Sequence, residues 1–116
     1  MDREFRHFDQ QLEQLRTSLL EMSALVESAV RRSITAVVNR NRALAAEVLQ
    51  DEARVNQMHI AVDEQATSLL ALRQPMASDL RLITSTLKIN SDLERIGDLA
   101  VNIVEEAIVI GLCARI

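Results

Sequence analysis

Two carboxylates, Glu94 and Asp98, stand four residues apart in the last third of the chain, within a pattern that is otherwise apolar and helical. On an α-helix, residues four apart lie on one face, so these two side chains would present their oxygens on the same side. Asn90 precedes this pair by one turn, and Asn102 follows it by one turn. Like charges at this spacing repel by about 0.2–0.5 kcal/mol on an exposed helix, and a bound cation reverses that repulsion. The spacing therefore predicts a short ladder of oxygen ligands.

Oxygen ligands suit hard or borderline cations such as Mg, Mn or Fe, whereas a structural zinc site would use Cys or His. The pattern predicts Glu94 and Asp98 as metal ligands, and Asp51, Glu52 and Asn102 as supporting residues. The expected cofactors are Fe, Mn, Mg or Zn ions, and no other cofactor is expected.

The same carboxylates also have a simpler interpretation, in which Asp98 pairs with Arg95 and Glu94 is solvated as part of an ordinary polar stripe. A carboxylate-bridged di-iron enzyme is a weaker alternative, because that class needs two Glu-x-x-His motifs and two further Glu residues. The sequence holds no glycine-rich phosphate loop and no Ser/His/Asp arrangement. We therefore expect no enzymatic activity and no catalytic residue.

Composition restricts the fold and the partners. The 116 residues fit a single domain, residues 1–116, and they include only two glycines and one proline. Hydrophobic residues make up 48% and aromatic residues 2%, so the core must be aliphatic, and no long stretch alternates as a strand does. A net charge of −4 without a basic stripe argues against nucleic acid. The single cysteine, the absence of a leader and the lack of a long apolar run predict a cytoplasmic protein without membrane insertion.

Three long helices are predicted, at about residues 4–38, 42–73 and 76–112. The polar cluster at residues 39–42 interrupts the first apolar pattern. Gln74-Pro75 ends the second, because proline restricts the residue before it and fits best at a helix start. Similar lengths and short turns predict an all-α fold, an antiparallel up-down-up three-helix bundle.

The apolar residues of the first two helices recur at alternating steps of three and four, as in a heptad seam. In the first helix these positions are Phe8, Leu12, Leu15, Leu19, Met22, Val26, Ala29, Ser33 and Ala36. In the second helix they are Leu44, Val48, Asp51, Val55, Met58, Val62, Gln65, Leu69 and Leu72.

The third helix has two apolar stripes instead of one. The first stripe consists of Leu80, Ile83, Leu87, Val101, Val104 and Ile108. The second stripe consists of Leu82, Ile89, Leu93, Ile96, Ala100, Ile103, Ala107 and Ile110. Such a wide apolar arc predicts burial on two sides, one within the bundle and one against a second bundle or a partner chain.

Folding the second and third helices about their turn places Asp98 level with Asp51. Folding the first helix back in the same way brings Glu27 near that level, so Glu27, Asp51, Glu52, Glu94 and Asp98 are expected to share one acidic layer.

Two blocks, Gln74-Pro75-Met76-Ala77-Ser78-Asp79-Leu80-Arg81 and Asp92-Leu93-Glu94-Arg95-Ile96-Gly97-Asp98, resemble the PhoU family of phosphate-transport regulators in sequence and spacing. With the three long helices, the resemblance covers essentially the whole chain. It implies a cytoplasmic regulator, not an enzyme, that acts between the phosphate ABC transporter, through its ATPase, and a sensor histidine kinase to keep phosphate-starvation genes off. In that family the acidic motif, here Glu94 and Asp98, binds metal.

Members of the family usually carry two tandem bundles with one acidic motif each, whereas this sequence predicts one bundle and one motif. The resemblance therefore implies a homo-oligomer, expected to be a dimer, that rebuilds the two-bundle form. The alternative is a purely structural helical module for interaction or oligomerisation, without metal.

Overall fold

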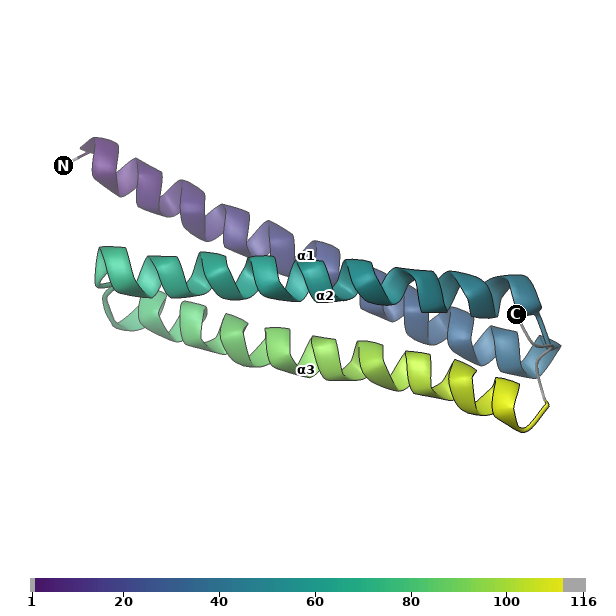
Figure 1. Cartoon of the computed structure of the whole chain (residues 1–116). Helices are drawn as coiled ribbons and strands as arrows, with labels where there is room; N and C mark the ends of the chain where they lie inside the picture. The colour runs from purple at the N-terminus through teal and green to yellow at the C-terminus, as the bar shows by residue number, and fades with distance from the viewer. Residues whose placement is uncertain (1, 112–116) are drawn as a thin grey trace.

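The computed structural model describes residues 2–111, and their side chains from residue 6 onward. Its helices α1 (Asp2–Asn39), α2 (Arg42–Arg73) and α3 (Ala77–Val109) run up, down and up in one elongated bundle (Figure 1). The bundle measures 60 × 19 × 17 Å, and each helix packs against both others. No strand occurs among the described residues. The predicted all-α three-helix bundle is thereby confirmed.

Both turns are short and have identifiable backbone geometry. Arg40, with φ +51°, follows α1 in the left-handed region. Asn41 then caps α2, because its side-chain oxygen accepts a hydrogen bond of 3.1 Å from the Leu44 N–H. Gln74, with φ +46°, ends α2 in the same left-handed region. Asp79 lies in the first turn of α3, where a negative charge suits the helix dipole.

Two helix ends differ from the predicted bounds by more than one residue. The first helix already includes Asp2, before the predicted start at residue 4. The third helix ends at Val109 and not at residue 112, because Gly111 adopts φ +79° and donates a hydrogen bond of 3.2 Å to the Ile108 carbonyl. Residue 112 itself lies outside the described residues.

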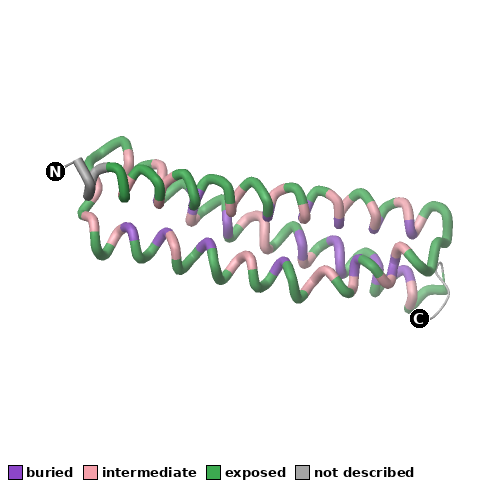
Figure 2. The backbone as a smooth tube through the Cα atoms, turned by 90° about the horizontal axis from the view of Figure 1, so that it is seen from above, coloured by how far each residue is buried: buried purple, intermediate pink, exposed green. Residues whose placement is uncertain are grey.

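The core consists of three apolar clusters stacked along the bundle axis, and Figure 2 shows the buried residues recurring along each helix. The cluster at the α2–α3 turn contains Leu15, Val62, Ala66, Leu69 and Ile83. The middle cluster contains Met22, Val26 and Val55. The cluster at the α1–α2 turn contains Ala29, Ala36, Ala45, Val48, Ala100, Val101 and Val104. Every predicted seam residue of α1 is buried or half-buried, but Leu72 of the α2 seam is exposed, since it lies in the last turn of its helix.

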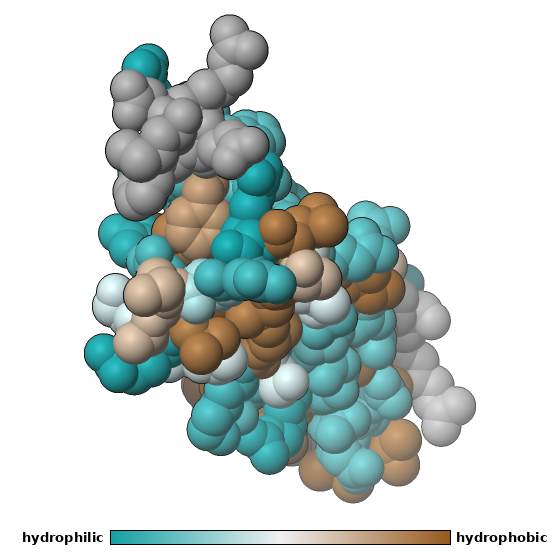
Figure 3. All heavy atoms as spheres, turned by 90° about the vertical axis from the view of Figure 1, so that its left-hand side faces the viewer, coloured by the Kyte–Doolittle hydropathy of each residue, from teal (hydrophilic) through white to brown (hydrophobic). Residues whose placement is uncertain are grey.

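The two apolar stripes of α3 have different surroundings. Ile83 and Val104 of the first stripe are fully buried in the bundle. Ile89, Ile96 and Ile103 of the second stripe remain 45%, 40% and 39% exposed. Apolar side chains are also visible between hydrophilic ones when the molecule is viewed along its axis from the α2–α3 turn (Figure 3). Within the described part of the chain, no helix is long and apolar enough to span a bilayer.

Candidate functional site

A small depression between α2 and α3 collects carboxylates from both helices. Asp51, Glu52 and Asn56 line it from α2, and Asp98 lines it from α3. We call this the acidic depression. Its remaining walls are apolar or lack a side chain: Ala29, Val48, Val55, Gly97 and Val101. The space open to a water-sized sphere is about 10 Å³, which is room for about one water molecule.

Close packing of α3 against α2 positions Asp98 at this depression. Gly97 is buried beside it, and a Cβ atom at Gly97 would lie 3.2 Å from Cγ1 of Val55 and 3.8 Å from Cγ2 of Val26. The missing side chain therefore lets α3 approach both other helices at the level of Asp98. Asp98 and Asp51 meet at one level, as expected from folding about the α2–α3 turn.

The predicted ladder of four oxygen side chains does not form one site. Asn90 is 1% exposed and points into the core, where its Nδ2 donates a 2.9 Å hydrogen bond to the His59 carbonyl. Glu94 is half-buried and Asn102 is exposed, and neither lines the acidic depression. The reason is geometric: four residues on a helix of 3.6 residues per turn advance the direction by about 40°. From Asn90 to Asn102, successive side chains therefore turn from the core toward solvent.

The expected acidic layer also contains fewer members than predicted. Asp51, Glu52 and Asp98 share the acidic depression, whereas Glu27 is exposed on α1 and does not line it. Asn56 was missed by the sequence reasoning, although it lies one turn after Glu52 on the same face of α2.

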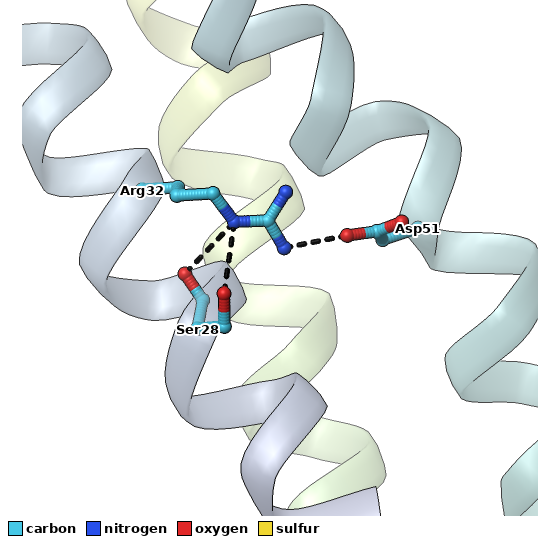
Figure 4. A network of polar contacts seen from close by, with 3 residues as sticks. All are labelled: Ser28, Arg32 and Asp51. Atoms are coloured by element: carbon cyan, nitrogen blue, oxygen red, sulfur yellow. Dashed lines mark hydrogen bonds and ion pairs between the residues drawn. The ribbon is translucent and has the colours of Figure 1, made fainter.

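Asp51 is already paired. Its Oδ2 lies 2.5 Å from Nη2 of Arg32 on α1, and the two side chains are 27% and 20% exposed (Figure 4). Arg32 is held in place by hydrogen bonds from its Nε to the carbonyl of Ser28, at 3.2 Å, and to Oγ of Ser28, at 3.0 Å. The sequence reasoning also missed Arg32, although folding α2 back against α1 brings Arg32 and Asp51 to one level. Asp51 thus belongs to a structural ion pair that links α1 to α2.

Asp98, by contrast, has no ion-pair partner among the described residues. Arg95 binds Asp92 instead, with 2.5 Å between Nη2 and Oδ1, and Lys88 Nζ lies 3.9 Å from the other oxygen of Asp92. The interpretation in which Asp98 pairs with Arg95 is therefore wrong. Asp92 and Asp98 each lie three residues from Arg95, and Arg95 pairs with Asp92, on its N-terminal side.

Comparison with known proteins identifies the family. The model of the PhoU domain matches residues 19–107, a range that contains the whole acidic depression. The chain belongs to the PhoU family.

Curated PhoU proteins and a solved PhoU structure resemble this chain closely. The phosphate-specific transport system accessory protein PhoU of Edwardsiella tarda is 45% identical over 101 residues, and that of Escherichia coli strain K12 is 41% identical over 101 residues. Each alignment covers 87% of this chain and 42% of the relative. The crystal structure of PhoU from Pseudomonas aeruginosa matches with a TM-score of 0.86 at 43% identity, over 89% of this chain and 49% of that one. The chain thus spans about half the length of the PhoU proteins that it matches, or somewhat less.

The acidic depression offers oxygen atoms from a few side chains but no cluster of metal ligands. Among the described residues, no three or more His, Cys, Asp or Glu side chains are grouped so that they could hold a metal ion. The side chains available at the acidic depression are the carboxylates of Glu52 and Asp98 and the amide of Asn56, which offer oxygen. Mg²⁺ and similar hard cations are often bound by one or two carboxylates while keeping several waters.

Proposed function

We propose that this chain is an accessory protein of phosphate uptake, which regulates phosphate transport and phosphate-starvation signalling through protein contacts and not through catalysis. The observation that carries the proposal is the PhoU domain match over residues 19–107. It is supported by relatives at 41–45% identity that are named accessory proteins of the phosphate-specific transport system. The proposed compartment is the cytoplasm, where such contacts would be made.

The proposed partners are the transporter ATPase and a sensor histidine kinase. We expect the purified ATPase subunit of the phosphate transporter, and the cytoplasmic part of the kinase, to be retained by the immobilised chain. The ATPase subunit of an unrelated ABC transporter serves as the control and should not be retained. Retention of neither protein, or equal retention of the unrelated ATPase, would contradict the proposed partners.

The second part of the proposal is a divalent cation site at the acidic motif. Asp98 is its first ligand, Glu94 contributes from the preceding turn, and Glu52 faces Asp98 across the acidic depression. Support comes from the oxygen-only donor set and from the unpaired state of Asp98. Asp51 is engaged by Arg32, and Asn102 is exposed and does not line the acidic depression, so they support the site only indirectly. The proposed ions are Fe, Mn, Mg or Zn.

This site predicts stabilisation by metal that depends on Asp98. In thermal unfolding with Mn²⁺ at about 100 times its dissociation constant, the wild type should gain about 2–3 kcal/mol, because the ion binds only the folded state. Asp98→Asn should lose this gain. Asp63→Asn is the matched control, since Asp63 is an exposed aspartate of α2 that does not line the acidic depression, and it should keep the gain.

Two results would count against the metal site: indifference of the wild type to Mg, Mn, Fe and Zn, or an equal response of both variants. Elemental analysis of the purified protein provides an independent reading. A chain that binds its partners but no metal would match the alternative of a helical interaction module without metal.

The third part of the proposal is self-association, with a homodimer as the expected state. It is supported by the second apolar stripe of α3, whose isoleucines remain exposed in the isolated bundle.

A further inference from the structure

A groove runs between α1 and α2 in the half of the bundle that ends in the α2–α3 turn. Its volume is about 320 Å³, near the lower end of the range for ligand pockets in proteins. Helix α1 contributes Gln11 and Gln14 to its lining, and α2 contributes Glu64, Gln65, Ser68 and Leu69. We call it the amide groove. None of these residues lines the acidic depression, so the two hollows are separate sites.

The core side chains of this half explain why room is left between the two helices. The cluster at the α2–α3 turn contains Leu15, Leu69 and Ile83, whereas the cluster at the other end consists of alanine and valine. Larger side chains at a contact hold helix axes farther apart. Figure 1 shows the N-terminal part of α1 separating from α2 toward this end.

Two hydrogen-bond acceptors of the amide groove have no partner within the described chain. Glu64 is exposed, and its carboxylate forms no ion pair there. Gln65 is half-buried, and its Oε1 is buried without a hydrogen bond. An acceptor in that state costs free energy, because it has lost its hydrogen bonds to water. The groove therefore favours a ligand that brings hydrogen-bond donors and a positive charge.

Arg73 shows that the lining accepts a guanidinium group. Its Nε donates a hydrogen bond of 3.3 Å to Oε1 of Gln11, at the end of the groove nearest the α2–α3 turn. Arg73 does not extend to Glu64, with which it forms no ion pair. The carboxylate of Glu64 and the amide of Gln65 are thus left for a guanidinium from outside the chain.

The charges beside the amide groove favour a basic ligand as well. A larger hollow of about 690 Å³ adjoins it, because Gln11 and Gln14 line both. Carboxylates predominate among the titratable residues of that hollow, which are Arg6, His7, Asp9, Glu13 and Glu21. Complementary charge attracts a basic segment to such a surface and disfavours an acidic one.

An arginine side chain fits both parts of this chemistry. Its guanidinium carries five N–H donors in one plane and stays charged, so it can serve a carboxylate and an amide oxygen together. Its aliphatic stem packs on apolar surface. Leu69, which is 2% exposed, is the apolar member of the lining.

We propose that the amide groove binds an arginine side chain from a basic segment of a partner protein, with Glu64 as its charge partner. Gln65 turns its amide oxygen toward the guanidinium and thereby gains the donor that it lacks in the free chain. The inference is independent of the metal site and of self-association, because the groove shares no residue with the acidic depression or with the second apolar stripe of α3.

NMR titration of the ¹⁵N-labelled chain with a capped Ala-Arg-Ala peptide tests the ligand class. The peptide should shift the side-chain amide signals of Gln14 and Gln65, with a dissociation constant in the millimolar range. The same peptide with citrulline, which has nearly the shape of arginine without its charge, should bind at least about threefold more weakly. Unmoved signals, or equal binding of the citrulline peptide, overturn the proposal.

Two substitutions of neighbouring acids test the position of the site. Glu64→Gln should weaken binding of the arginine peptide about threefold or more, because a charge-assisted hydrogen bond becomes a neutral one. Asp63→Asn is the matched control, since Asp63 is exposed on the same helix but does not line the groove, and its effect should stay below about twofold. Equal effects would mean that only the general negative charge attracts the peptide, and the assigned site would be wrong.

Gln65→Leu distinguishes binding from a structural role of Gln65. The substitution removes an amide whose oxygen has no partner, so the midpoint of thermal unfolding should not fall. The arginine peptide should nevertheless bind about twofold or more weakly, because one acceptor is lost. Unchanged peptide binding overturns the role assigned to Gln65, whatever the midpoint. These measurements need neither metal nor the transporter ATPase, so they can fail where the tests of the proposed function succeed.

Discussion

Gly97→Leu is expected to destabilise the bundle by about 3 kcal/mol or more, because the new side chain has no free space to occupy. Even a Cβ atom at this position would lie 3.2 Å from Cγ1 of Val55 and 3.8 Å from Cγ2 of Val26. Both valines are at most 5% exposed and belong to the middle core cluster. Chemical denaturation followed by circular dichroism measures the change. Because Gly97 adjoins Asp98, the same substitution should also disturb the acidic depression.

Gly97→Ala distinguishes the effect of the tight contact with Val55 from the effect of helix propensity. Alanine favours the helix over glycine by about 1 kcal/mol, and the tight approach to Val55 opposes this gain, so the single substitution should be nearly neutral. In a Val55→Ala background the obstructing methyl groups are gone, and Gly97→Ala should then stabilise by about 1 kcal/mol. If Gly97→Leu were tolerated within about 1 kcal/mol, α3 would not approach α2 as closely as described.

The fold could be predicted from the sequence because its signals are local and repeated. The seam from Phe8 to Ala36 is regular over many turns, and its residues are buried or half-buried in the bundle. The turn at Gln74-Pro75 follows from the conformational limits of proline. Short turns between three long helices leave an antiparallel bundle as the simple arrangement. The third helix ended earlier than expected because Gly111 takes a left-handed conformation, which the apolar pattern does not encode.

The site could be predicted only in part, because it depends on directions and partners that periodicity does not specify. The level shared by Asp98 and Asp51 follows from counting residues from the turn, and the structure brings both to the acidic depression. Arg95 is equally near to Asp92 and Asp98 in sequence, so its pairing with Asp92 depends on side-chain conformation. Likewise, Arg32 on α1 pairs with Asp51 on α2, and no spacing within one helix reveals a pair between two helices.

The same limit applies to the two stripes of α3, which looked equivalent in the sequence. The structure makes them unequal: Ile83 and Val104 of the first stripe are fully buried, whereas the second stripe is divided between the buried Ala100 and Ala107 and the exposed isoleucines Ile89, Ile96 and Ile103. Gly97 lies on the buried side of the same helix, where a Cβ atom would be 3.2 Å from Cγ1 of Val55.

This inequality can be measured with the same substitution at two positions of one helix. Ile83→Ala should cost about 2–5 kcal/mol in the free energy of unfolding, because Ile83 is fully buried in the cluster with Leu15 and Val62 and its loss leaves a cavity. Ile89→Ala removes the same atoms from a side chain that is 45% exposed and should cost less than about 1 kcal/mol. Both are measured by urea denaturation at a protein concentration at which the wild type is monomeric. Equal costs, or a larger cost at Ile89, would mean that α3 is rotated about its axis relative to the structure. Such a rotation would also move Asp98 away from α2 and remove the acidic depression, so this pair of variants tests the fold and the geometry of the site together.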